Sequence, residues 1–129
     1  MVNDPIADFL VRLQNASRVG HERVTLPFSK AKYALAELLS KEGYVGDVEH
    51  KKDSHALVVE LKYASGGLPA IAGTKRVSKP SRRLYMGVRD IRPVKRGHGL
   101  LVLSTPAGVL TDKEARRKRV GGEALFEIW

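Results

Sequence analysis

The sequence predicts an α+β protein with two small subdomains. We expect an α-β-α-β-β order in the N-terminal subdomain and a mainly β C-terminal subdomain with one short helix. Three observations support this: apolar residues at helical spacing near the start, strand-like alternation after them, and frequent Pro and Gly later. The uncharged segment ASGGLPAIAG separates the halves. The expected subdomains are 1–66 and 67–129.

The segment NDPIADFLVRLQNASRVG predicts the first helix. Asp4 suits the N-cap, and Pro5 suits the first helical position because its missing N–H is not needed there. Four apolar side chains share one face at helical spacing, namely Ile6, Phe9, Leu10 and Leu13. The segment RVTLPF predicts a short strand, and its Pro27 indicates a sheet edge or a strand end.

The segment KAKYALAELLSKE predicts the second helix, with Ser29 as its N-cap and Gly43 at its end. Its apolar face is expected to contain Ala31, Leu35, Leu38 and Leu39. The segments GYVGDVEH and HALVVELKY are expected to pair as a hairpin around KKDS, because apolar and polar residues alternate in the second.

The second half begins with a basic stretch, 74–99, that Pro and Gly break into short strands and loops. LLVLST predicts a buried strand, and GVLT continues after a tight turn. Thr111 and Glu114 predict a capping box for the helix DKEARRKRV, which Gly121 or Gly122 is expected to end. EALFEIW predicts a closing strand.

The net positive charge of the chain lies entirely in its second half. Residues 1–74 hold nine Lys or Arg and nine Asp or Glu, whereas residues 75–129 hold fourteen and five. The net charge of +9 is therefore carried by the second half of the sequence. This placement favours a polyanionic partner over a basic surface that only contacts solvent. Nucleic acid is favoured over membrane, because the basic segments lack a long amphipathic helix with a bulky apolar face.

Composition argues against several other classes of protein. There is no cysteine, which excludes disulfides and thiolate chemistry and fits a reducing cytoplasm. No apolar run approaches the roughly 20 residues of a membrane span, and the first residues do not resemble a signal peptide. The four histidines form no metal-binding pattern, and Ser104 has no base at informative spacing. We expect no enzyme activity, no metal and no cofactor.

Lys30 and Lys32 are candidate phosphate ligands. Both lie in the first turn of the second helix, where positive charge opposes the helix dipole. A phosphate near Ser29 would compensate, because helix N-termini bind anions. The alternative is a pair of screened surface lysines.

Tyr85 lies within a run of cations that includes Lys79, Arg82 and Arg83. Lys and Arg neutralise phosphates, and an exposed aromatic ring stacks on a base or sugar. The segment could equally be a core strand with a charged outer face. Both interpretations are compatible, because alternation directs Tyr85 away from Leu84 and Met86.

Ser104 and Thr105 precede Pro106 and a nearby Gly108, which suggests a rigid tight loop. Its hydroxyls could contact RNA sugars, phosphates or base edges, or could instead cap the turn itself. The last helix carries five cations: Lys113, Arg116, Arg117, Lys118 and Arg119. For the last two, a favourable interaction with the helix dipole is a structural alternative.

The segment GHGLLVLSTPAGVLTDKEARRKRVGGEALFEIW resembles the C-terminal signature of the bacterial small-subunit ribosomal protein S-eight family. That signature has a Gly-x-Gly lead-in, an apolar strand, Ser-Thr-Ser-x-Gly, Thr-Asp-x-x-Ala-Arg, Gly-Gly-Glu and an apolar end. The segments NDPIADFLVRLQNA, LPFSKAKYALAELLSKEGY and RVSKPSRRLY also look like family segments. The resemblance covers essentially the whole chain.

The resemblance implies a structural and assembly protein of the small ribosomal subunit. Such a protein is a primary binder of the central domain of small-subunit ribosomal RNA, chiefly through its C-terminal half. The implied neighbours are ribosomal proteins S-five and S-twelve. Some relatives also repress their own operon by binding messenger RNA. The implied location is the cytoplasm, in the small ribosomal subunit.

The resemblance also implies roles for particular residues. The Ser104–Thr105 loop occupies the position of a family RNA contact, and Gly122–Glu123 is expected to border it in space. Tyr85 and Lys30 match family motifs. Pro106 replaces the second serine of the family pattern, so a hydroxyl contact there is lost while the backbone turn can persist.

Three rival functions are compatible with parts of this pattern. A non-ribosomal RNA-binding module or repressor would have the same fold and site. A DNA-binding protein would bind duplex DNA at least as well as RNA. A hydrolase would depend on the Ser104 hydroxyl.

Overall fold

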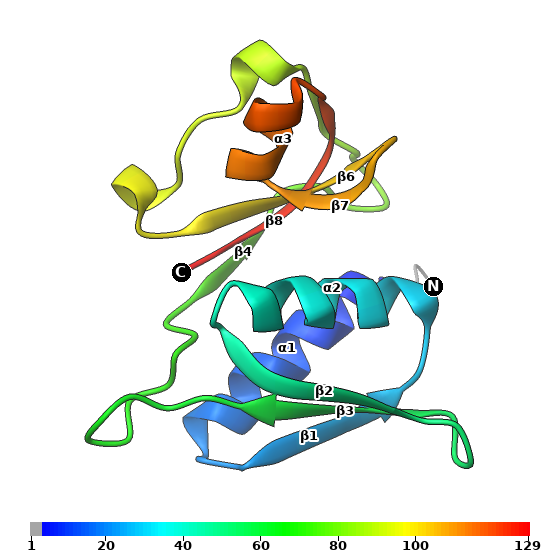
Figure 1. Cartoon of the computed structure of the whole chain (residues 1–129), viewed down its shortest axis with the longest axis vertical. Coiled ribbons are helices and arrows are strands. Elements are labelled where there is room, and N and C mark those ends of the chain that lie inside the picture. Colours follow the sequence, from blue (N-terminus) through cyan, green and yellow to red (C-terminus); the bar gives the residue numbers. More distant parts are fainter. Residues whose placement is uncertain (1–3) are drawn as a thin grey trace. The chain divides into compact units, whose positions relative to one another are not determined.

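The computed structural model describes residues 4–129, which form two compact units (Figure 1). The N-terminal unit is Pro5–Ala72, and the C-terminal unit is Gly73–Trp129 together with Asp4. The observed division therefore falls after Ala72, beyond the expected division after residue 66. Two backbone hydrogen bonds explain its place: Ala64 N–H donates to Leu68 O across 2.7 Å, and Ala70 N–H to Lys62 O across 3.0 Å. They fold the small, uncharged segment back onto the N-terminal unit.

The N-terminal unit has the predicted α-β-α-β-β order. Its elements are α1 (Pro5–Arg18), β1 (Arg23–Pro27), α2 (Lys30–Lys41), β2 (Val45–Lys51) and β3 (Ala56–Leu61). The strands pair antiparallel in the order β1-β3-β2, so β1 is an edge strand, as Pro27 indicated. Both helices lie on the same side of this sheet (Figure 1). Phe9 and Leu57 are among its fully buried side chains.

The ends of α2 confirm the predicted caps. Ser29 Oγ accepts a hydrogen bond of 3.1 Å from Lys32 N–H. Gly43 has a left-handed φ of 86°, and the following Tyr44 N–H donates back to Leu39 O. The predicted apolar face was wrong at Ala31, which is exposed. Lys32 is buried instead, with only 9% of its surface exposed.

The C-terminal unit is mainly β with one short helix, as predicted. Its elements are β4 (Thr74–Arg76), β5 (Tyr85–Met86), η1 (Val88–Asp90), η2 (Lys95–Gly97), β6 (Leu100–Thr105), β7 (Gly108–Thr111), α3 (Asp112–Lys118) and β8 (Gly122–Ile128). The sheet order is β4-β8-β6-β7, and β5 also pairs with β8. All these pairings are antiparallel. β8 is therefore the strand that joins the sheet together.

Helix α3 covers one face of this sheet. Ala115 packs there against a buried cluster from β6, β7, β8 and the preceding loops: Ile91, Val94, Leu101, Leu103, Leu110 and Ala124. The predicted capping box is present, because Thr111 Oγ1 accepts from Glu114 N–H and Glu114 Oε1 accepts from Thr111 N–H.

The predicted end of α3 at Gly121 or Gly122 was wrong. The helix ends at Lys118, and Arg119 follows in the left-handed conformation with a φ of 57°. Gly121 and Gly122 instead allow neighbouring strands to pack closely. A Cβ atom on Gly121 would collide with Met86 O, so Gly121 is small because two strands meet beside it.

Candidate nucleic-acid interface

The β6–β7 connection is a two-residue turn, Pro106–Ala107, between the paired residues Thr105 and Gly108. Thr105 Oγ1 donates to Gly108 O across 2.7 Å and accepts from Ala107 N–H across 3.1 Å. Gly108 has a φ of 104°, which favours glycine strongly. The Thr105 hydroxyl therefore holds the turn, and its remaining capacity toward a ligand is as an acceptor.

Ser104 differs from its neighbour. Its side chain is exposed and makes no hydrogen bond to any of residues 4–129. Of the two candidate hydroxyls, Ser104 therefore offers both a donor and acceptors, while Thr105 shapes the backbone.

Strand register places Ser104 in line with two other predicted residues. Glu123 on β8 pairs with Ser104 on one side and with Tyr85 of β5 on the other. Directly paired residues point to the same face of a sheet, so Tyr85, Glu123 and Ser104 form one row. Two strand spacings separate its ends, which is about 10 Å. The row lies on the face opposite Leu103, which packs beneath α3.

Gly122 allows these strands to come close together. A Cβ atom built there would collide with Ser104 O and lie 3.0 Å from Thr105 Cγ2. The Gly122–Glu123 pair therefore borders the hydroxyl loop directly, as the sequence resemblance implied. Any larger residue at 122 would displace β6 from β8.

Tyr85 projects into solvent. It is 68% exposed, while Leu84 and Met86 on either side pack against the buried cluster beneath α3. The segment is thus a strand that packs against the core through Leu84 and Met86 and leaves Tyr85 exposed, as alternation predicted.

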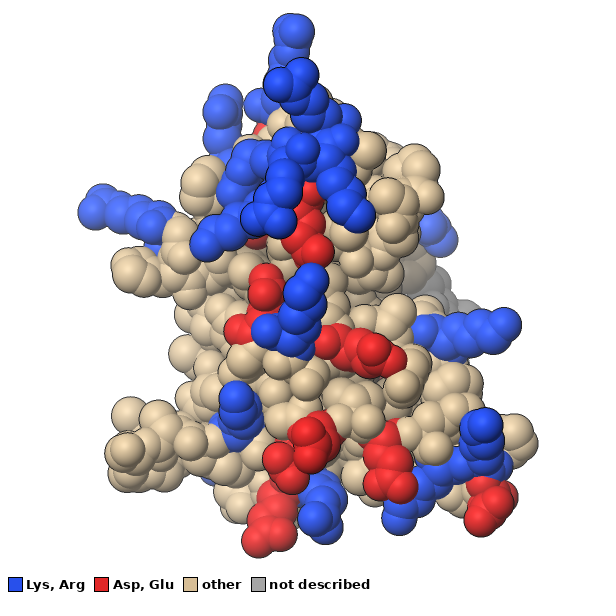
Figure 2. All heavy atoms as spheres, in the orientation of Figure 1, with Lys and Arg blue, Asp and Glu red and all other residues tan. Residues whose placement is uncertain are grey.

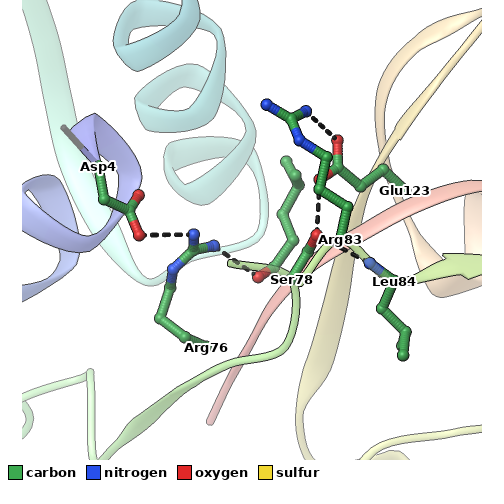
Figure 3. A network of polar contacts seen from close by, with 7 residues as sticks. Asp4, Arg76, Ser78, Arg83, Leu84 and Glu123 are labelled. Atoms are coloured by element: carbon green, nitrogen blue, oxygen red, sulfur yellow. Dashed lines mark hydrogen bonds and ion pairs between the residues drawn. The ribbon is translucent and has the colours of Figure 1, made fainter. Parts of the chain in front are cut away.

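The basic loop 78–84 is held by a polar network (Figure 3). The hydroxyl of Ser78, which keeps only 1% of its surface, donates to Glu123 Oε2 across 2.6 Å and accepts from Leu84 N–H. Arg83 Nη1 lies 3.5 Å from the other oxygen, Glu123 Oε1. Both oxygens of the row's one carboxylate therefore have a partner in this loop: one accepts a hydrogen bond from Ser78, and the other is paired with Arg83.

Lys79 and Arg82 close the same loop through reciprocal backbone hydrogen bonds of 3.0 and 2.9 Å. Their side chains and that of Arg83 are exposed. Of these three cations, Arg83 contacts β8 through Glu123, while Lys79 and Arg82 lie earlier in the same loop, which leads through Leu84 to Tyr85.

The cations of α3 divide into two kinds. Arg116 Nη2 lies 3.2 Å from Asp112 Oδ2, and Asp112 keeps 2% of its surface, so this pair is structural. Lys113 is exposed, but it belongs to the helix on the other face of the sheet and is not part of the row. Figure 2 shows Lys and Arg gathered over the α3 part of the C-terminal unit, with both signs of charge mixed over the N-terminal unit.

Lys30 and Lys32 lie in the N-terminal unit, apart in sequence from the row. Lys30 is exposed beside the Ser29 cap. Lys32 is mostly buried, so only Lys30 retains the free surface position expected of both.

Sequence reasoning missed Ser78 and Arg76 as organising residues. Arg76 was counted as one cation of the basic stretch, but it donates to Leu125 O across 2.9 Å and pairs with Asp4 at 2.8 Å (Figure 3). Ser78 had no local signal, because its carboxylate partner lies 45 residues away in sequence.

No helix within residues 4–129 combines the length and hydrophobicity of a membrane span. Over the same residues, no three His, Asp or Glu side chains gather into a possible metal site.

Comparison with known proteins places these features in a family. A family model described as "Ribosomal protein S8" matches residues 4–129. The chain is 50% identical over 129 residues to "Small ribosomal subunit protein uS8" of Oleidesulfovibrio alaskensis, with both chains covered completely. It is 51% identical over 130 residues to the protein of that name from Rubrobacter xylanophilus, with 99% of this chain and 98% of the relative covered. The chain therefore belongs to the ribosomal protein S8 family.

Proposed function

We propose that this protein is a structural constituent of the small ribosomal subunit and binds the central domain of its ribosomal RNA. One observation carries the proposal: the row of Tyr85, Glu123 and Ser104 lies beside a fixed two-residue turn in the unit that holds the net positive charge. Family membership and the names of the relatives support the ribosomal setting.

The proposed mechanism separates attraction from recognition. Lys79, Arg82 and Arg83 neutralise phosphates and position the RNA backbone, with an affinity that falls as salt rises. Tyr85 stacks on an unpaired base or sugar, and the free Ser104 hydroxyl bonds a base edge or a 2′-hydroxyl about 10 Å away. Such spacing suits a distorted RNA helix, because a regular A-form major groove is too narrow for side chains.

Glu123 is compatible with an RNA-binding face because it is not a free anion. Ser78 donates to one oxygen, and Arg83 lies against the other. Without these partners the carboxylate would repel phosphates between the two recognition residues. We therefore assign Glu123 a positioning role: it fixes the basic loop at the edge of the row.

The remaining predicted residues are peripheral in this proposal. Pro106 keeps the turn rigid through its fixed φ, and Gly122 permits the close strand approach. Lys113 contributes long-range attraction from the other face of the sheet. Lys30, exposed at the N-terminus of α2, makes a secondary phosphate contact, to which the mostly buried Lys32 adds only positive charge.

The proposal extends to partners that follow from the resemblance. Ribosomal proteins S-five and S-twelve are the proposed protein neighbours in the assembled subunit, in the cytoplasm. The same row would also bind a messenger RNA of similar shape, which makes repression of the protein's own operon a consequence of the same recognition. A protein in this role needs no catalytic group or cofactor.

The test is a titration of the intact protein against three ligands of equal length: a central-domain ribosomal RNA fragment, a regular RNA duplex and a DNA duplex. We expect the ribosomal fragment to bind most tightly and to keep its preference as salt rises. Ser104→Ala and Tyr85→Ala should reduce that preference, whereas Lys52→Gln, in the β2–β3 hairpin, should not. Equal binding of all three ligands, weakening together with salt, would overturn the proposal.

A further inference from the structure

The loop Arg92–His98, between η1 and β6, is basic, exposed and backbone-strained. Its four cationic or titratable side chains are Arg92, Lys95, Arg96 and His98, and all are exposed. Within residues 4–129 none of the four forms a salt bridge. We propose that this loop is a second RNA phosphate-binding site, independent of the row that contains Ser104 and resting on the RNA-binding function proposed above.

The backbone of the loop is unusual. Lys95 and Arg96 have left-handed φ angles of 48° and 55°, and Gly97 follows at 91°. The left-handed conformation is unfavourable for residues other than glycine, because their Cβ atom crowds the backbone, and here two consecutive residues adopt it. Strain of this kind persists only where the surrounding structure enforces it, and it is concentrated at ligand sites.

The residues at both ends of the loop hold the left-handed conformation of Lys95 and Arg96 in place. Val94 keeps 6% of its surface, and its carbonyl accepts from both Gly97 N–H and Gly99 N–H, at 2.9 and 3.1 Å. At the other end Gly99 lies beneath β8: a Cβ atom there would be 2.9 Å from Ile128 O. The two ends are thus fixed in the core, and the cations between them are held at the surface.

Lys95 has an additional restraint. Its Nζ lies 4.5 Å from the centre of the Trp129 ring, and that ring packs over Gly73, where a Cβ would approach within 2.7 Å. The ring orients the ammonium without neutralising it, so the full charge remains available to an anion. Because the Lys95 side chain is already ordered, less conformational entropy is lost when it binds a phosphate.

The loop lies at the opposite end of β6 from the Ser104–Thr105 turn (Figure 1). The two ends of the six-residue strand β6 lie about 17 Å apart. A single nucleotide cannot contact both places, so the loop would bind a different stretch of RNA backbone.

A phosphodiester backbone fits this loop better than an acidic protein segment. Protein interfaces centre on large apolar or aromatic anchors in buried pockets. The exposed large hydrophobic residues of the described chain are Val11, Val19, Leu68 and Tyr85, and none lies in this loop. Phosphate contacts require only cations.

The test uses the intact double variant Lys95→Asn/Arg96→Asn, because asparagine accepts left-handed φ and the fold should survive. Lys51→Gln/Lys52→Gln, in the β2–β3 hairpin, is the control with the same change in charge. Binding of the central-domain fragment is measured across a salt series, together with hydroxyl-radical protection of the RNA backbone. We expect the slope of log affinity against log salt to fall by about 1.4–1.8, the value for two lost cations, and one protected RNA segment to disappear.

The outcomes separate the two proposals. A slope and protection pattern equal to those of the hairpin control overturn the second site while leaving recognition by the row intact. Loss of incorporation into ribosomal subunits with unchanged RNA binding also overturns it, and assigns the loop to an acidic protein neighbour. If wild-type protein shows no preference for the ribosomal fragment, the function proposed for the row fails, whatever the double variant does.

Discussion

The Ser78 hydroxyl lies 2.6 Å from Glu123 Oε2, and this contact joins the start of the basic loop to β8, where Arg83 also pairs with Glu123. Ser78 is buried, while Glu123 stands between the two exposed residues of the row. The conformation of the basic loop thus depends in part on a neutral side chain that is buried away from solvent.

The first prediction concerns Ser78→Ala. The change leaves Leu84 N–H and one Glu123 oxygen without their partner, so the free energy of unfolding should fall by about 1–3 kcal/mol. RNA affinity should weaken as well, because Lys79 and Arg82 lose their fixed position. Urea unfolding and an RNA titration measure the two effects. Ser81→Ala, an exposed serine of the same loop, is the control, and equal stability of the two variants would contradict the prediction.

The second prediction separates the two hydroxyls beside the turn. Thr105→Val removes both side-chain hydrogen bonds of the hydroxyl. The free energy of unfolding should fall by about 0.5–1.5 kcal/mol for each bond, and RNA binding should weaken. Thr105→Ser keeps the oxygen and should bind RNA like the wild type. Ser104→Ala should leave stability within about 0.5 kcal/mol of the wild type while reducing the preference for the ribosomal fragment. A stability loss in Ser104→Ala as large as that in Thr105→Val would show that the roles are wrongly assigned.

The third prediction concerns Gly122→Ala. The added methyl group would collide with Ser104 O, and relief requires β6 and β8 to separate. We expect a loss of about 1–3 kcal/mol in unfolding free energy, together with weaker RNA binding. Gly87→Ala is the matched control, because Gly87 has an ordinary φ of −75° and its new Cβ would meet only Asp90 Oδ2, at 3.6 Å. Equal effects of the two changes, measured by urea unfolding, would rule out the proposed close approach.

The fourth prediction concerns the ring of Tyr85. Stacking should survive in Tyr85→Phe and vanish in Tyr85→Ala, which is expected to weaken RNA binding by about 1–3 kcal/mol. Neither variant should change the free energy of unfolding by more than about 0.5 kcal/mol, because the Tyr85 side chain is exposed. Equal weakening in both would indicate a hydroxyl contact, and unchanged binding in both would remove Tyr85 from the interface.

Features set by neighbouring residues could be predicted from the sequence. The Ser29 cap of α2 and the Thr111–Glu114 capping box each join residues three apart, and both are present. Alternation along 84–86 correctly directed Tyr85 outward, since a strand period needs only its own residues.

Features that depend on distant segments could not be predicted. The end of α3 was placed at a glycine, whereas Arg119 takes the left-handed position and the glycines serve strand packing. The exposure of Lys32 was misjudged, because burial depends on what packs against a helix as well as on its own periodicity. The network around Glu123 joins residues from opposite ends of the C-terminal unit, a separation that no spacing rule spans.

The central place of β8 has a consequence for synthesis. The strands that carry Tyr85 and Ser104 are β5 and β6, and both pair with β8. Among the described strands, β8 is the last to be translated. A nascent chain that has not yet extended past Glu123 carries most of the cations but lacks the strand that aligns Tyr85 with Ser104. Pairing of such distant segments comes late in folding. Selective recognition should therefore begin only after β8 has been synthesised and paired, so a nascent chain that lacks β8 would bind RNA by charge alone, without selectivity.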